Sequence, residues 1–334
     1  MSIHRSTRRF LCALVCLLAF AGTAAAQVPH YDSFYTFGDS LADTGNIFAG
    51  TTFLRFDPPV PPSEHPHQTY FHGRFSNGPV AFEYLWELLS GNPPGSPGGL
   101  KPFTTAPILG RTGAVDFSFG GTGTPFLDQT PGGFFAPGLK GQIELFRAGL
   151  RGRRPSRHAL YAIVTGANDY RDDPFNVPMS PVEVVANIAD GIRTLYTLGA
   201  RDIMVLGLPD LGALPGGTPE GSALTALHNQ LLANALSALA VLPGIRLIPV
   251  DINGAFVLLP PAMDKTTPAL DVFYPPVLFP PGFMMSLCLF INPATCLDVP
   301  TFDTGSQFLF WDAVHPTTAA HRVLAKHLFN SLPN

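Results

Sequence analysis

Ser40 ends an apolar run in a tight turn that contains glycine. The stretch YTFGDSLADTGN, residues 35–46, is largely aromatic up to Phe37 and then breaks into Gly38, Asp39 and Ser40. A serine just past a strand is often the cap of the next helix. It can also be a nucleophile held at the strand's tip, and its hydroxyl then needs a base to take its proton. For this stretch alone, both interpretations are open.

A base of the right type lies near the other end of the chain, in FWDAVHPT, residues 310–317. Imidazole titrates near neutral pH, so His315 can accept and return a proton. Asp312 comes three residues earlier, and on a tight turn its carboxylate can reach the Nδ1–H of His315 and fix the tautomer. The alternative for this pair is a capped helix start in front of Pro316. Ser40, Asp312 and His315 together would form a catalytic triad.

Two further segments can stabilise the oxyanion that forms when a serine attacks an ester. The backbone N–H of Ser40 is one donor, a backbone N–H at Gly120 or Gly121 is the second, and the amide of Asn168 is the third. Glycine suits this position because a side chain would keep the substrate's oxygen away. Asn168 on its own is equally typical of a turn. The other polar residues of the serine turn are expected to brace it: Asp39, Asp43 and Asn46.

These residues follow short runs that are apolar on both faces, as strands of a sheet covered on both sides must be. The predicted strands are 33–37, 114–119, 159–165, 202–208 and 246–250. Helical patterns are found at 79–89, 180–198, 222–242 and 317–332. This alternation predicts a parallel sheet in a three-layer α/β/α domain. Ligands of such sheets bind beyond the carboxyl ends of the strands, which is where the serine, the glycines and the asparagine lie.

Four sequence blocks, FGDSLADTGN, DFSFGGTG, GAND and FWDAVHPT, resemble in this order the SGNH (GDSL) family of serine esterases and lipases. GRFSNGP at 73–79 and GLPDLGALP at 207–215 are similar to one branch of that family. This branch contains bacterial secreted phospholipases, haemolysin-like lipases and acyltransferases. The loop with two cysteines before FWDAVHPT is similar to it as well.

The resemblance implies the SGNH hydrolase fold, with a flavodoxin-like, five-stranded parallel sheet. It implies catalytic roles for the nucleophile Ser40, the triad partners Asp312 and His315, and the oxyanion-hole residues Gly121 (or Gly120) and Asn168. Two positions depart from the family pattern, since Asp116 stands where Asn is common and Ser118 where Ala is common. Hydrogen bonding around these two positions is therefore open. No cofactor and no metal is expected.

The first 26 residues have the pattern of a secretory signal peptide. Three arginines precede an apolar run at residues 10–21, and three alanines stand before Gln27. We expect residues 27–334 to form a single SGNH hydrolase domain with long loop insertions at about 50–78 and 255–308. The protein would be secreted or periplasmic, by either the general or the twin-arginine route.

Composition limits the partners. The chain has 20 basic and 24 acidic residues, and losing three Arg with the signal peptide leaves 17 against 24, so nothing suggests a nucleic-acid partner. The two cysteines that remain, Cys288 and Cys296, are expected to form a disulfide in an exported chain. Several histidines are expected to be solvated or on the surface rather than metal ligands: His65, His67, His72, His321 and His327.

These patterns predict an exported carboxylic ester hydrolase that works through an acyl-enzyme. Loops rich in Phe and Pro favour lipid or medium-chain acyl esters, with transient contact to a lipid surface. The segment 273–290 is expected to line or cover an acyl pocket. Acyltransferases and carbohydrate acetylesterases or deacetylases use the same groups and are alternatives. A catalytically inactive surface-binding module is an alternative from a different class.

Overall fold

The computed structural model describes residues 30–172, 176–215, 217–272, 277–278, 284–285 and 306–333. The expected signal peptide and the expected disulfide between Cys288 and Cys296 lie outside these residues and stay predictions. The same holds for most of the segment 273–290. Only the antiparallel pair β9 (Val277–Leu278) and β10 (Met284–Met285) is described there. None of the described helices is long and apolar enough to cross a membrane.

Six parallel strands form one sheet in the order β2-β3-β1-β6-β7-β8. They are β1 (Ser33–Gly38), β2 (Lys101–Pro102), β3 (Gly113–Asp116), β6 (Ala159–Val164), β7 (Asp202–Leu206) and β8 (Arg246–Val250). All five predicted strands are present, and their order is the flavodoxin-like one. The expected number of five was wrong by one, because edge strand β2 is only two residues long and leaves no sequence pattern.

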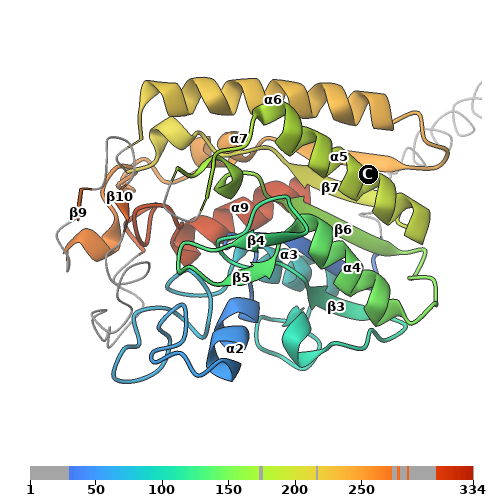
Figure 1. Ribbon diagram of the computed structural model, residues 1–334, viewed down its shortest axis with the longest axis horizontal. Helices are drawn as coiled ribbons and strands as arrows, with labels where there is room; N and C mark the ends of the chain where they lie inside the picture. The colour runs from blue at the N-terminus through green and yellow to red at the C-terminus, as the bar shows by residue number, and fades with distance from the viewer. Residues whose placement is uncertain are drawn as a thin grey trace, which may run out of the picture. The chain divides into compact units, whose positions relative to one another are not determined.

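Helices cover both faces of this sheet, which confirms the three-layer α/β/α fold (Figure 1). One face packs against α4 (Leu139–Leu150), α5 (Pro181–Leu198) and α6 (Pro219–Leu239). The other face meets α3 (Ala81–Ser90), which lies beside α9 (Thr318–Asn330). The shorter elements are α2 (Asn46–Phe53), α7 (Ile252–Val257) and the antiparallel hairpin of β4 (Leu127–Gln129) and β5 (Phe135–Pro137).

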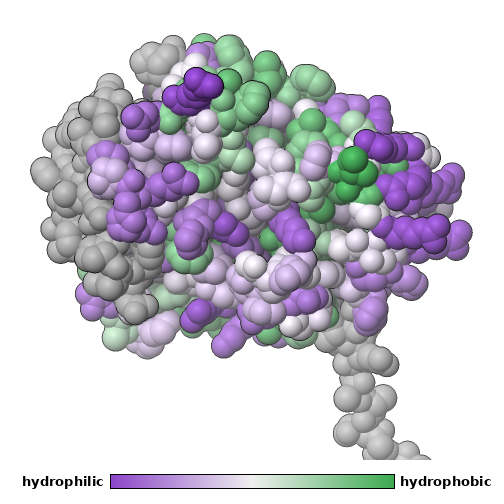
Figure 2. All heavy atoms as spheres, turned by 90° about the horizontal axis from the view of Figure 1, so that it is seen from below, coloured by the Kyte–Doolittle hydropathy of each residue, from purple (hydrophilic) through white to green (hydrophobic). Residues whose placement is uncertain are grey.

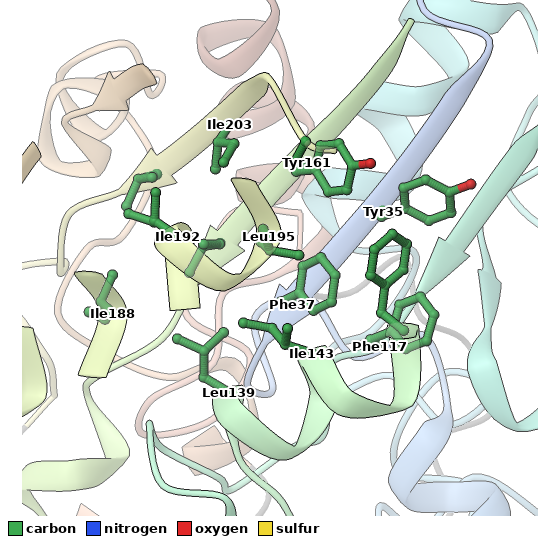
Figure 3. Close-up of a cluster of buried hydrophobic side chains, with 14 of the residues drawn as sticks. Tyr35, Phe37, Phe117, Leu139, Ile143, Tyr161, Ile188, Ile192, Leu195 and Ile203 are labelled. Atoms are coloured by element: carbon green, nitrogen blue, oxygen red, sulfur yellow. The ribbon is translucent and has the colours of Figure 1, made fainter. Parts of the chain in front are cut away.

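The core on the α4–α6 side is built from alternate residues of the strands (Figure 3). Tyr35 and Phe37 of β1 point into it, whereas Phe34 points to the opposite face and stacks on Trp86 of α3. Phe37 stacks on Phe117 with ring centroids 5.4 Å apart. Burying one such side chain contributes about 2–3 kcal/mol. The chain therefore enters the serine turn from a strand that is fixed on both sides.

The sequence patterns did not predict three of the helices, namely α2, α4 and α7. Helix α4 has apolar residues at helical spacing, but Gly141 and Gly149 interrupt it and lower the helical propensity. The structure explains Gly141, because a Cβ there would lie 2.2 Å from the carbonyl oxygen of Phe126. Where a predicted helix had a clear start signal, the prediction held. Ser180 caps α5 by accepting the N–H of Glu183.

Candidate active site

The residues singled out for chemistry meet at the carboxyl edge of the sheet. Ser40 follows β1, Gly120 and Gly121 follow β3, and Asn168 follows β6. His315 comes from the loop in front of α9. All five line one cavity of about 270 Å³. Asp312 lies behind His315, almost fully buried. The structure thus brings together all six predicted site residues.

A continuous chain of hydrogen bonds joins the serine, the histidine and the aspartate. The Nε2 atom of His315 lies 2.8 Å from the Oγ of Ser40, and its Nδ1 atom lies 2.6 Å from the Oδ2 of Asp312. The other oxygen of Asp312 accepts the backbone N–H groups of Val314 (2.9 Å) and of His315 itself (2.8 Å). This geometry matches the requirement that the base contact the nucleophile on one side and an orienting carboxylate on the other.

The carboxyl of Asp312 stays ionised although it is buried. Burial raises its pKa, but the nearby His315 and the hydrogen bonds to the carboxylate outweigh burial, so the pKa lies below its usual range. An ionised carboxylate is what stabilises an imidazolium on the neighbouring ring. The pair is therefore electrostatically prepared for proton transfer at His315.

The turn that presents Ser40 depends on Gly38. The φ angle of Gly38 is +155°, and a Cβ there would lie 1.9 Å from the carbonyl oxygen of Val164 on β6. No residue with a side chain fits such a close approach. Gln142 of α4 clamps the same glycine, because its Oε1 accepts the Gly38 N–H (2.8 Å) and its Nε2 donates to the Gly38 carbonyl (2.8 Å). Helix α4, which the sequence analysis missed, is thus part of the site's support.

Only one of the two glycines after β3 has an N–H to spare for a ligand. The N–H of Gly120 donates to Oδ2 of Asp43 at 2.8 Å. The N–H of Gly121, a residue with φ of +78°, has no such partner among the described contacts. Asn168 uses one amide hydrogen on the carbonyl of Thr122 (3.1 Å) and retains the second. Together with the N–H of Ser40, these groups can surround a developing oxyanion.

Buried acids brace the loops around the serine, as expected for Asp43. Besides Gly120, Asp43 accepts the N–H groups of Gly45 and Asn46, at 2.7 and 2.6 Å. Burial raises its pKa, and these N–H donors counteract the rise. Asp39, next to Ser40, is buried as well, and burial raises its pKa to about 7. These carboxylates act as acceptors for backbone N–H groups and make no contact with the Oγ of Ser40 among the described bonds.

Asp116, which departs from the family pattern, has a full set of donors. It accepts hydrogen bonds from the hydroxyls of Thr36 (2.7 Å) and Thr44 (2.9 Å) and from the backbone N–H groups of Thr44 and Ser118, both at 2.8 Å. Burial raises its pKa, and the charge of Asp43 raises it further. The residue therefore ties the serine turn to the end of β3.

Tyr70 is a member of the site that the sequence analysis missed. Its hydroxyl donates to the Oδ2 of Asp312 at 2.8 Å, and the whole residue is buried. Tyr70 belongs to the long insertion at 50–78, and 242 positions separate it from Asp312. Spacing cannot reveal a contact of that separation. The GRFSNGP block that begins three residues later was the one available hint.

The chain matches one known protein family over most of its length. Residues 34–328 match the GDSL-like lipase/acylhydrolase family, a stretch that includes every site residue from Ser40 to His315. The chain belongs to this GDSL family. It is accordingly an enzyme that acts on ester bonds.

Relatives of this GDSL enzyme cover nearly all of its length. A phosphatidylcholine-sterol acyltransferase of Aeromonas hydrophila is 27% identical over 95% of this chain and 94% of its own. A GDSL esterase/lipase of Arabidopsis thaliana is 26% identical over 100% of this chain and 99% of its own. Among solved structures, a variant of an acetyl-xylooligosaccharide esterase from Geobacillus is 14% identical, with a TM-score of 0.44, over 90% of this chain and 93% of that one.

The cavity of the GDSL enzyme that contains Ser40 is lined by many apolar side chains. Some come from the insertion and the β4–β5 turn, among them Val60, Pro131 and Phe134. Others come from α6, α7, α9 and the segment before α6: Leu211, Leu214, Leu224, Ile252, Phe256 and Leu324. An ester with an apolar substituent fits such a lining, since desolvating the substituent is favourable.

One expectation about this GDSL enzyme was wrong. His321 was expected on the surface, but only 1% of its area is exposed, and it lies in the cavity wall. It falls on the inward stripe of α9 with Ala320 and Leu324. Burial, together with the charge of His315, lowers the pKa of His321 to about 3. His327, six residues further on, is half-buried and contacts the Asp251 carbonyl.

No metal site is apparent in the part of the chain that the structure describes. Groups of three or more His, Cys, Asp or Glu side chains that could hold an ion are absent there. His65 and His67, in the proline-rich insertion, both take part in other interactions.

Proposed function

We propose that this protein is an exported carboxylic ester hydrolase with Ser40 as its nucleophile. The observation that carries the proposal is the 2.8 Å contact between the Oγ of Ser40 and the Nε2 of His315, with Asp312 on the far side of the ring. In the first step, His315 takes the hydroxyl proton while Oγ attacks the ester carbonyl. His315 then gives this proton to the departing alcohol, and an acyl-enzyme remains.

Hydrolysis of the acyl-enzyme completes the cycle. A water molecule loses its proton to His315 as it attacks the acyl carbon, and the acid leaves when Ser40 regains a proton. In both steps the oxyanion accepts hydrogen bonds from the N–H groups of Ser40 and Gly121 and from the amide of Asn168. We assign the glycine donor to Gly121 rather than Gly120, since Asp43 already occupies the N–H of Gly120.

We propose lipid or medium-chain acyl esters as substrates. Support comes from the apolar side chains that line the cavity containing Ser40. The name of the Aeromonas relative, a phosphatidylcholine-sterol acyltransferase, makes acyl transfer to an alcohol a second candidate. Transfer and hydrolysis share the acyl-enzyme, and they differ only in whether an alcohol or water attacks it.

A lipid partner also suits the surface beside the cavity. Exposed apolar side chains gather at the end of α2 and on the hairpin: Phe53, Leu54, Phe126, Leu127 and Phe135. Leu127 and Phe135 share the outer face of the hairpin, and Phe56 joins the two groups through an edge contact with Phe134 at 5.4 Å. Figure 2 views the molecule from below and shows hydrophobic side chains exposed in groups among hydrophilic ones. We propose that this apolar surface makes transient contact with lipid.

The test compares wild type with Ser40→Ala on p-nitrophenyl esters from acetate to palmitate. We expect wild-type hydrolysis with an optimum above acetate, and a loss of at least about a thousandfold in the variant. Adding a long-chain alcohol and measuring the new ester by mass spectrometry separates transfer from hydrolysis.

Two outcomes would contradict the proposal. Undiminished activity in a folded Ser40→Ala protein would remove Ser40 as the nucleophile. A folded wild type that cleaves only acetate would favour a carbohydrate acetylesterase, and one that cleaves no ester would favour a surface-binding module.

Sequencing the N-terminus of the exported protein, with Gln27 expected first, tests the signal peptide.

A further inference from the structure

Residues 70–77 of the long insertion wrap around the loop that carries the triad histidine. The ring of Phe75 lies 5.2 Å from the ring of His315, centroid to centroid. The hydroxyl of Ser76 donates to the carbonyl of Pro316 at 2.8 Å. Asn77 accepts the N–H of Thr318, the first residue of α9, at 2.8 Å. The segment thus contacts the loop on several sides of the histidine.

The contact of Tyr70 differs from these because it reaches an atom that holds the triad together. The Oδ2 of Asp312 accepts both the Nδ1–H of His315 at 2.6 Å and the hydroxyl of Tyr70 at 2.8 Å. With the two backbone N–H groups on Oδ1, the carboxylate has four donors. Tyr70 and Asp312 are both buried, so water does not compete for these positions.

We propose that Tyr70 is a positioning residue for the Asp312–His315 pair. The proposal rests on the proposed function and extends it to a part of the chain far from the motif blocks. The hydroxyl fixes the direction of the Oδ2 lone pairs, and therefore the plane and tautomer of the imidazole. It also takes up part of the carboxylate's charge, so Asp312 holds a proton on His315 less strongly than it would alone.

Tyr70→Phe tests this, because the ring remains and only the hydroxyl is lost. We expect kcat for a p-nitrophenyl ester to fall about tenfold, the scale of one hydrogen bond to a charged group, with KM unchanged. Tyr84→Phe is the matched control. Tyr84 is also buried, and its hydroxyl contacts Thr318 at 2.7 Å, near the same loop but without touching the triad. Both variants should lose similar thermal stability, and only Tyr70→Phe should lose kcat.

The pH profile supplies a readout that a structural role would not move. Without the Tyr70 hydroxyl, the full charge of Asp312 acts on the imidazolium and stabilises it. The acid limb of kcat/KM should therefore move to higher pH by roughly half a unit in Tyr70→Phe. In Tyr84→Phe it should stay where it is. In an Asp312→Asn background, Tyr70→Phe should have little further effect on kcat, because Tyr70 acts through this carboxylate.

A measurement without turnover separates this proposal from the proposed function. The low-field proton resonance of the His315 Nδ1–H should shift in Tyr70→Phe and stay unchanged in Tyr84→Phe, even if no ester is ever cleaved. The proposal is overturned if this resonance, kcat and the acid limb all match the control. It is equally overturned if the loss in kcat persists in full when Asp312 is already Asn.

Discussion

At the scale of single residues, one buried carboxylate connects the two halves of the site. Asp43 accepts N–H groups from the turn after Ser40 and the N–H of Gly120 from the loop after β3. Because Asp43 takes up the N–H of Gly120, the N–H of the neighbouring Gly121 is the one that can bind a ligand. Sequence reasoning predicted that Asp43 braces its own turn. It did not predict the contact with Gly120, which joins residues 77 positions apart.

A buried neutral histidine gives the residue scale a prediction for stability. The pKa of His321 is about 3 when folded and about 6.5 when unfolded. Below pH 6.5 the unfolded chain therefore binds a proton that the native state does not, and this group's contribution to stability falls as the pH drops toward 3. His321→Leu removes the effect. The free energy of unfolding of the variant minus that of wild type should therefore be about 2 kcal/mol larger at pH 5 than at pH 8.

Urea unfolding of wild type and variant at the two pH values measures this difference. His327→Leu is the control, because it changes the same residue type on the same helix at a half-buried position. An equal change in stability at pH 5 and pH 8 for His321→Leu would show that the native state protonates this ring as readily as the unfolded chain does.

At the scale of elements, helix α4 supports the turn that follows β1. Gln142 is fully buried, and both ends of its amide are bonded to Gly38. Its Nε2 also donates to the carbonyl of Pro137 at 3.0 Å. One side chain thus ties the end of the central strand to the end of the hairpin that borders the cavity.

Replacing this amide should affect both stability and catalysis. Gln142→Leu leaves the N–H of Gly38 buried without a partner and removes one of the two donors to its carbonyl, which keeps the N–H of Phe119, so it should cost about 2 kcal/mol in the free energy of unfolding. A shifted serine turn should lower kcat by roughly tenfold to a hundredfold. Gln230→Leu on the exposed face of α6 should change neither quantity. Chemical denaturation and steady-state kinetics test both expectations, and a kcat equal to that of the control would contradict the role of α4.

The same element shows how far sequence reasoning reaches. Strands β1, β3, β6 and β7 are buried on both faces and are largely apolar, so they were predictable, and motif residues that follow β1, β3 and β6 located the site. Helix α4 was not predictable, because Gly141 serves a close approach to Phe126 that lies outside the helix. Tyr70 and Gln142 were missed for a related reason. Their roles come from tertiary contacts, which no local pattern encodes.

At the scale of the whole molecule, the apolar surface on α2 and the hairpin lies next to the cavity wall formed by Val60 and Phe134. Phe53 is 86% exposed and Phe135 is 63% exposed. When a lipid surface covers such exposed apolar side chains, apolar area is removed from water and the free energy falls. The cavity and this surface would then meet the same lipid layer.

Phe53→Ser combined with Phe135→Ser tests this contact. Binding to phosphatidylcholine vesicles, measured by sedimentation in the Ser40→Ala background, should weaken roughly tenfold or more. When Ser40 is kept, the double variant should hydrolyse a soluble p-nitrophenyl ester at the wild-type rate. Val241→Ser, at a position 81% exposed between α6 and β8, is the control. Unchanged vesicle binding would rule out the surface as a lipid contact. If the wild type formed dimers in solution and the double variant did not, the surface would be assigned to self-association.

The residues of the candidate site come from two halves of the chain that meet in the sheet. The exposed loop at residues 151–154 separates a segment with Ser40 and Gly121 from a segment with Asn168 and His315. The two segments meet along β1 and β6, which pair over six residues at the centre of the sheet. If the chain is cut at this loop, neither piece contains the whole set of site residues, but each contains one strand of the β1–β6 pair. Ester cleavage by a mixture of the two pieces would therefore report that they have associated.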